Sequence, residues 1–239
     1  SKRMSEYIHF VIAEKKDNVW IAQRQGRSKN SNDLTQPAIL KMMAMGGEGT
    51  IIERLKQLHI VPLAISYEYD PCDYLKAREY QLRRDLPYWK KTAEDDLESM
   101  LVGIKGYKGH IFYKCAPCID EWLDTVDEDL PKNKLFDAIA AHIDHEIHCN
   151  YKLYPINYVA LDMIQDTRVY EEYYTAEDYQ NFNAYLDGQI EKIEIENRDD
   201  KFLRTCLLTQ YAYPAKNYIA ASSENGRFKS LLNRLTFKK

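Results

Sequence analysis

The sequence predicts an α/β protein with part of a mainly parallel sheet flanked by helices, followed by an all-helical C-terminal extension. Over residues 1–150, apolar runs typical of strands alternate with helical patterns, which is the order of a parallel sheet. One of these runs, residues 60–67, is almost continuously apolar, as in strands buried on both faces of a sheet. After about residue 150 only helical patterns follow. We therefore expect two parts, an α/β part over 1–150 and a helical extension over 151–239.

The first elements are a helix, a strand and a cationic loop. Met4, Ile8 and Val11 recur at helical spacing, so the chain should begin with an amphipathic helix. Residues 19–23 have the apolar, strand-forming composition of a buried strand. The next helix is expected over residues 38–45, because proline is favoured in the first turn of a helix and Pro37 stands there.

The middle of the chain supplies two more predicted strands separated by helices. A helix over residues 51–58 leads into the apolar run 60–67. Two helices are expected next, over 74–84 and 87–102, and residues 109–114 form the third predicted strand.

The last 89 residues read as helical and carry opposed charges. The segment 175–178 has the Thr-x-x-Asp pattern that caps helix starts. Residues 161–200 hold twelve acidic side chains, whereas residues 201–239 hold eight basic ones. Such blocks form solvated faces or pair with each other, and a basic terminus also suits contact with anionic lipid.

Composition narrows the classes of protein to consider. The chain has 239 residues, of which 45% are hydrophobic, and a net charge of -4, which argues against a general nucleic-acid binder. No apolar run approaches the ~18 residues that a membrane span needs, and no signal peptide opens the sequence. Five cysteines are an odd number, so we expect no disulfide framework. A cytoplasmic protein is expected, with at most peripheral contact with the inner face of the membrane.

The candidate binding site is the cationic loop after the first predicted strand. Its residues are Arg24, Gln25, Gly26, Arg27, Ser28 and Lys29. In α/β proteins, ligands lie beyond the carboxyl ends of strands, where backbone N–H groups and basic side chains converge on an anion. The loop should therefore bind a phosphate or carboxylate. The alternative is a solvated basic loop with no ligand.

Two other groups of residues contain side chains that are typical of redox pairs or of metal sites. Cys115 and Cys118 have the Cys-x-x-Cys spacing of thioredoxin-type redox pairs, although they follow the last predicted strand rather than an early one. His142, His145 and His148 are spaced three apart, so on a helix they advance by about 300° and do not share one line. We interpret them as a polar helix face and expect no metal site.

The loop and two of the apolar runs resemble the glycerolipid acyltransferase family, which includes the glycerol-3-phosphate and lysophosphatidic acid acyltransferases. Gln25-Gly26-Arg27-Ser28 resembles the family's Glu-Gly-(Thr/Gly)-Arg-Ser block, whose arginine and glycine hold the acceptor's phosphate. Residues 60–65 resemble the family's Val-Pro strand, and residues 109–119 its last sheet strand with a closing proline. The resemblance covers most of the chain. It implies that Arg27 and Arg24 bind the acceptor's anion, helped by Lys29 and by the backbone amides of Gly26 and Ser28.

The sequence departs from the family at two points. Gln25 stands where the family has glutamate, and the catalytic His-x4-Asp is absent, since no histidine from His9 to His148 has an aspartate five residues later. In the family this pair precedes the loop, so we expect it upstream of Ser1 and assign no catalytic residue here.

The resemblance implies transfer of an acyl chain from acyl-CoA or acyl carrier protein to a hydroxyl of a glycerophosphate or related lipid, with no further cofactor. The alternatives are a non-catalytic fragment or relative that binds lipid head groups or a protein partner and, third, a redox module on Cys115 and Cys118.

Overall fold

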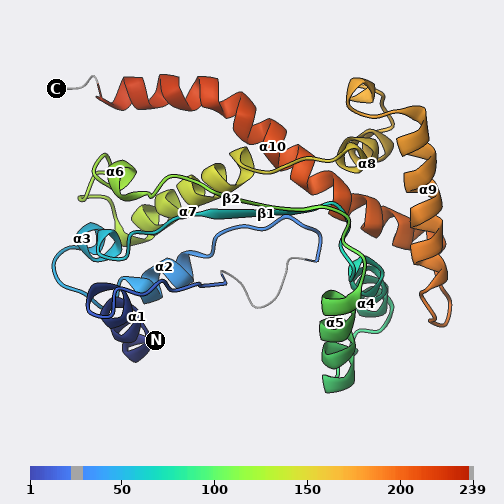
Figure 1. The fold of residues 1–239 in the computed structure, drawn as a ribbon, viewed down its shortest axis with the longest axis horizontal. Helices are drawn as coiled ribbons and strands as arrows, with labels where there is room; N and C mark the ends of the chain where they lie inside the picture. Colours follow the sequence, from blue (N-terminus) through green and yellow to red (C-terminus); the bar gives the residue numbers. More distant parts are fainter. Residues whose placement is uncertain (23–28, 237–239) are drawn as a thin grey trace. The chain divides into compact units, whose positions relative to one another are not determined.

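The fold is mostly helical, with a single pair of strands among the described residues (Figure 1). The computed structural model describes residues 1–22 and 29–236, with side chains as far as residue 223. Strand β1 is Leu63–Tyr67 and strand β2 is Ile111–Cys115. The Glu68 N–H donates to the His110 carbonyl and the Ala116 N–H to the Pro62 carbonyl, both at 2.9 Å, so the strands are antiparallel. The prediction of a mainly parallel sheet flanked by helices is therefore wrong.

The error comes from reading apolar runs as buried parallel strands. Residues 19–22 form no strand, and the Trp20 side chain is 71% exposed. In β1, Ala64 and Ser66 are buried while their neighbours are partly exposed, so only one face is covered. Every residue of β2 is exposed. An apolar run indicates an extended segment, but it specifies neither the partner strand nor its direction.

The chain divides into two compact units whose boundary crosses both strands. Of the described residues, the first unit contains 1–22, 33–64 and 113–150, and the second contains 29–32, 65–112 and 151–236. Each unit has a hydrophobic core of its own.

The first unit is built from five helices in the described residues: α1 Lys2–Ala13, α2 Pro37–Met43, α3 Ile51–Lys56, α6 Asp120–Leu123 and α7 Lys132–Cys149. Leu55, Ile119 and Ile139 are at most 1% exposed in its core. The fully buried Ser5 hydroxyl donates to the Met43 carbonyl at 2.6 Å and accepts from the Gly46 N–H at 2.8 Å. This pair of bonds fixes α1 against the end of α2.

In the second unit, three helices pack against the last one. Its helices are α4 Asp73–Asp85, α5 Ala93–Lys105, α8 Pro155–Gln165, the 3-10 turn η1 Glu171–Tyr173, α9 Ala176–Glu191 and α10 Asp200–Thr236. Helix α10 contacts α8, α4 and α9, and the core includes Phe182, Leu186 and Leu207. The Thr175 hydroxyl accepts from the Asp178 N–H at 3.0 Å, so the expected cap is confirmed. No described helix combines the length and the apolar character that crossing a membrane requires.

Candidate functional site

Most of the predicted anion-binding loop falls outside the described residues. This applies to Arg24, Gln25, Gly26, Arg27 and Ser28, whose roles stay predictions. Lys29 is described, and its ammonium group forms an ion pair with the Glu79 carboxylate of α4. The Glu79 side chain is only 8% exposed and also accepts from Arg83 Nε at 2.8 Å. Lys29 therefore anchors the end of the loop to α4, a structural role in addition to the anion contact predicted for it.

An apolar pocket of about 300 Å³ lies in the first unit at the start of this loop. Its lining comes from α1 (Met4, Tyr7, Ile8), from α2 (Met42) and from residues 19–22. The indole of Trp20 is the largest lining group, and most of its surface is open to solvent. Residue 22 is two positions before Arg24, so covalent geometry alone keeps the two Cα atoms within about 7.6 Å. The pocket suits a hydrocarbon chain, and the cationic residues follow it directly in the sequence.

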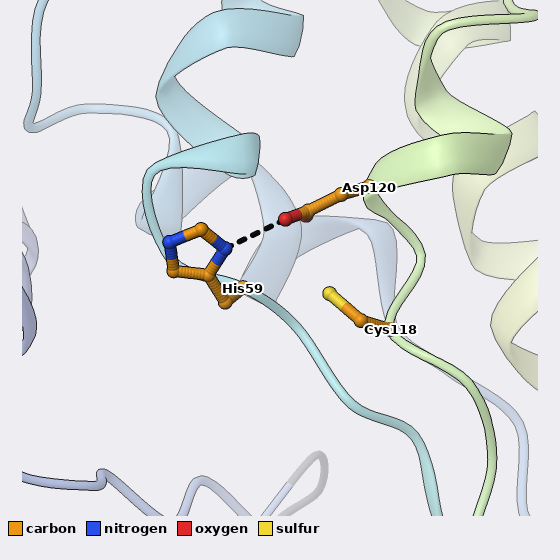
Figure 2. Close-up of side chains that lie close together, drawn as sticks. All are labelled: His59, Cys118 and Asp120. Atoms are coloured by element: carbon orange, nitrogen blue, oxygen red, sulfur yellow. Dashed lines mark hydrogen bonds and ion pairs between the residues drawn. The ribbon is translucent and has the colours of Figure 1, made fainter.

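A group of three side chains in the first unit has metal-ligand chemistry: His59, Cys118 and Asp120 (Figure 2). His59 follows α3, and Asp120 is the first residue of α6. The His59 Nδ1–H donates to Asp120 Oδ2 at 2.6 Å. One ligand atom from each side chain lies within 4.8 Å of the other two. Within residues 1–22 and 29–223, no other group of three His, Cys, Asp or Glu side chains meets the same condition.

The environment of the Cys-x-x-Cys pair does not favour redox chemistry. The described cysteines are all free; Cys115 is exposed and Cys118 is half-buried. Burial raises the pKa of the Cys118 thiol, and the Asp120 carboxylate beside it acts in the same direction. Reactive redox cysteines need the opposite shift. The redox function stays an alternative without structural support.

The three histidines of α7 have separate partners rather than a common one. The ring of His142 stacks on Trp122 with centroids 3.9 Å apart, and burial lowers the pKa of His142 to about 4. His145 Nε2 lies 3.5 Å from the Cys149 sulfur, and His148 Nε2 lies 3.3 Å from the Asp33 carbonyl oxygen. The histidines stabilise the packing around α7.

A buried carboxylate with two tyrosines joins three helices of the second unit. Asp73 Oδ2 accepts from the Tyr211 hydroxyl at 2.6 Å and from the Tyr185 hydroxyl at 2.7 Å. Burial raises the pKa of Asp73 to about 6, although the two tyrosine hydrogen bonds oppose the shift. Tyr185 also lines a groove of about 410 Å³, to which Lys105 and Lys192 contribute. The carboxylate cluster is a polar contact of α4, α9 and α10 that the sequence analysis missed.

Sequence reasoning also missed His59 and Asp120, although their positions held a signal. His59 stands just before one apolar run, and Cys118 and Asp120 follow the other. In antiparallel strands the start of one lies beside the end of the other, which brings these residues together. In the parallel sheet that the sequence predicted, His59 and Asp120 would lie at opposite ends of the strands.

No protein family, curated protein or solved structure matches the chain, so the sites described above are interpreted from their own residues.

Proposed function

We propose that this chain forms the acceptor-binding part of an acyltransferase. The enzyme transfers an acyl chain from acyl-CoA or acyl carrier protein to a hydroxyl of a glycerophosphate or related lipid. The proposal assigns lipid and phosphate binding to these residues and no catalytic residue, because the His-x4-Asp pair of the family that the chain resembles is absent from them.

The observation that carries the proposal is the apolar pocket at the start of the cationic loop. A glycerophospholipid acceptor has a hydrocarbon chain and an anionic phosphate, which need an apolar surface and a cluster of cations next to each other. The Trp20 side chain and α1 offer the first, and the loop that begins two positions after Ala22, at Arg24, offers the second. A free inorganic anion or a soluble sugar phosphate would need only the loop.

Two further blocks of the resemblance are neighbours in the structure, where they pair in the antiparallel direction rather than in the expected parallel sheet. Residues 60–65 and 109–119 pair through the Ile119 N–H, which donates to the Ile60 carbonyl at 3.0 Å, and through the bond from Ala116 to Pro62.

The residue roles follow from chemistry. Arg24 and Arg27 present planar guanidinium groups, which bind two phosphate oxygens at once. The backbone N–H groups of Gly26 and Ser28 add donors, and Gln25 offers an amide where the family has a carboxylate. Lys29 is the third cation of the sequence block, and its ammonium group pairs with Glu79 in the second unit.

The test is a comparison of three ligands by titration calorimetry on the chain itself. The ligands are a short-chain lysophosphatidic acid below its micelle concentration, glycerol 3-phosphate, and the matching monoacylglycerol. Arg27→Ala should weaken the two phosphate-bearing ligands by about 30-fold, the size of one charge-assisted hydrogen bond of about 2 kcal/mol. Binding of monoacylglycerol should not change.

A second variant tests the apolar half. Trp20→Ala should weaken the two acyl-bearing ligands by about tenfold and leave glycerol 3-phosphate unaffected, because about 1.4 kcal/mol of apolar contact is lost. Arg168→Ala, which removes an exposed arginine outside the loop and pocket, is the control and should change nothing. Equal effects of Arg27→Ala and Arg168→Ala on all three ligands would overturn the proposal.

A further inference from the structure

The side chains of His59, Cys118 and Asp120 come from segments about 60 positions apart and converge at one end of the strand pair. The view in Figure 2 shows the imidazole and the carboxylate facing each other, with the Cys118 sulfur on the same side of the chain. From this convergence we propose that the three side chains bind one divalent transition-metal ion of the Zn²⁺ class. The ligand atoms are His59 Nδ1, Cys118 Sγ and a carboxylate oxygen of Asp120.

The donor set selects the class of metal. Imidazole nitrogen, thiolate sulfur and carboxylate oxygen together are ligands of Zn²⁺, whereas Ca²⁺ and Mg²⁺ take oxygen ligands almost exclusively. Three protein ligands leave a fourth tetrahedral position for water. The His59 side chain is 71% exposed, so solvent reaches the cluster.

An independent observation points to a missing partner. Asp120 Oδ1 is buried and has no hydrogen-bond partner among the described residues, although Oδ2 of the same carboxylate pairs with His59. A buried carboxylate oxygen without a partner is costly. A cation shared by this carboxylate, the imidazole and the thiolate would remove that cost. The hydrogen bond from His59 does not remove that cost, because it pairs with Oδ2 and not with Oδ1.

The backbone holds the ligands near the required geometry before a metal binds. The Ile119 N–H, between Cys118 and Asp120 in sequence, donates to the carbonyl of Ile60, the residue after His59. His59 itself has φ +48, a left-handed conformation that is uncommon outside glycine. Tetrahedral Zn²⁺ needs about 3.3 Å between nitrogen and oxygen ligands. The present distance between His59 Nδ1 and Asp120 Oδ2 is 2.6 Å, so these two atoms would have to move apart when a metal binds.

A metal bound by these three side chains would link the segment before β1 to the segment after β2. It would join the segment after α3 to the start of α6, both in the first unit, and so stabilise that unit against unfolding. The site lies outside the lipid pocket, so it is independent of the proposed function.

The experiment uses metal-free protein titrated with Zn²⁺ and, for spectroscopy, with Co²⁺. We expect one ion per chain, a rise in Tm that increases with free metal concentration, and a thiolate-to-cobalt charge-transfer band in the near ultraviolet. Cys118→Ser should abolish the band, and His59→Gln should weaken binding by about 100-fold. Zn²⁺ should also protect Cys118, and not Cys115, from iodoacetamide in the unmodified chain, a readout that needs no variant.

The chain supplies matched controls. Cys115→Ser removes an exposed thiol three positions from Cys118, and His110→Gln removes an exposed histidine whose Nδ1 pairs with Glu68 at 2.8 Å in the second unit. Both variants should bind metal as the parent does. The proposal is overturned if the controls lose affinity as much as Cys118→Ser and His59→Gln, if Co²⁺ gives no thiolate band, or if Zn²⁺ leaves Cys118 unprotected.

Discussion

Asp73 shows how a single buried side chain links the stability of the second unit to pH. Its carboxylate is almost fully enclosed, and its hydrogen-bond donors include two tyrosine hydroxyls. Burial raises the pKa of Asp73 to about 6 in the folded chain, against 3.8 for a free side chain. The folded state therefore holds the proton more tightly than the unfolded state does. The stabilisation from protonation is largest below about pH 4 and is lost as the pH rises through 6.

The expected result is a pH-dependent difference between the parent and Asp73→Asn. From pH 5 to pH 7.5 the parent should lose about 1 kcal/mol of unfolding free energy that the variant, which does not titrate, keeps. Urea unfolding at both pH values measures it, with Asp166→Asn on the surface as a control. If parent and Asp73→Asn show the same pH dependence, the raised pKa of Asp73 is wrong.

At the scale of elements, α4 holds the last residue of the cationic loop through the partly buried Lys29–Glu79 ion pair. Lys29→Met should destabilise the protein by about 1–3 kcal/mol, because it takes one cation from a carboxylate that is nearly enclosed. Lys2→Met removes the exposed cation of an i,i+4 pair with Glu6 and should cost less than about 0.5 kcal/mol. Chemical unfolding compares the two. Equal stabilities would show that Lys29 is no anchor.

Helices were the elements that the sequence predicted best, because their signals are local. The apolar periodicity of the first helix and the Thr175–Asp178 cap both appear in the structure. The helix expected from residue 87 instead begins at Ala93, where Thr92 and Asp95 form a capping box that the analysis overlooked. A Thr-x-x-Asp pattern is as clear at 92 as at 175.

The pairing of the two strands could not be predicted from local sequence patterns. The runs at 60–67 and 109–114 contain the strands, but their antiparallel direction depends on the 43 residues between β1 and β2, which form α4 and α5. For the same reason His59 and Asp120 could not be joined from sequence. The sequence singled out Cys118 only because of its spacing to Cys115. Its neighbours His59 and Asp120 depend on the relative direction of the two strands.

At the scale of the whole molecule, the chain forms two units made of interleaved segments. Residues 65–112, which include α4 and α5, belong with the helices after residue 150, and Phe182, Leu207 and Ala77 share one core. The expected division into an α/β part over 1–150 and a helical extension over 151–239 stays a prediction. Helix α4 therefore contributes, together with α8 and α9, to the core in which α10 buries its apolar face.

The two proposed sites use different parts of the first unit. The lipid pocket lies between α1, α2 and residues 19–22, whereas the metal ligands lie at the ends of α3 and β2. A negative result in the test of one site therefore does not overturn the proposal for the other site. Loss of metal binding would leave the acceptor site unaffected, and loss of lipid binding would leave the metal site unaffected.

The most direct test of the proposed function is acyl transfer itself. The assay follows a radiolabelled acyl group from acyl-CoA or acyl carrier protein to a lysophosphatidic acid or glycerol 3-phosphate, in an enzyme that carries this chain together with a catalytic His-x4-Asp pair. Arg27→Ala should lower kcat/KM for the acceptor by about 30-fold, equivalent to about 2 kcal/mol, while Arg168→Ala leaves it unchanged. An Arg27→Ala enzyme with the parent's kcat/KM would contradict the assignment of this loop to the acceptor's phosphate.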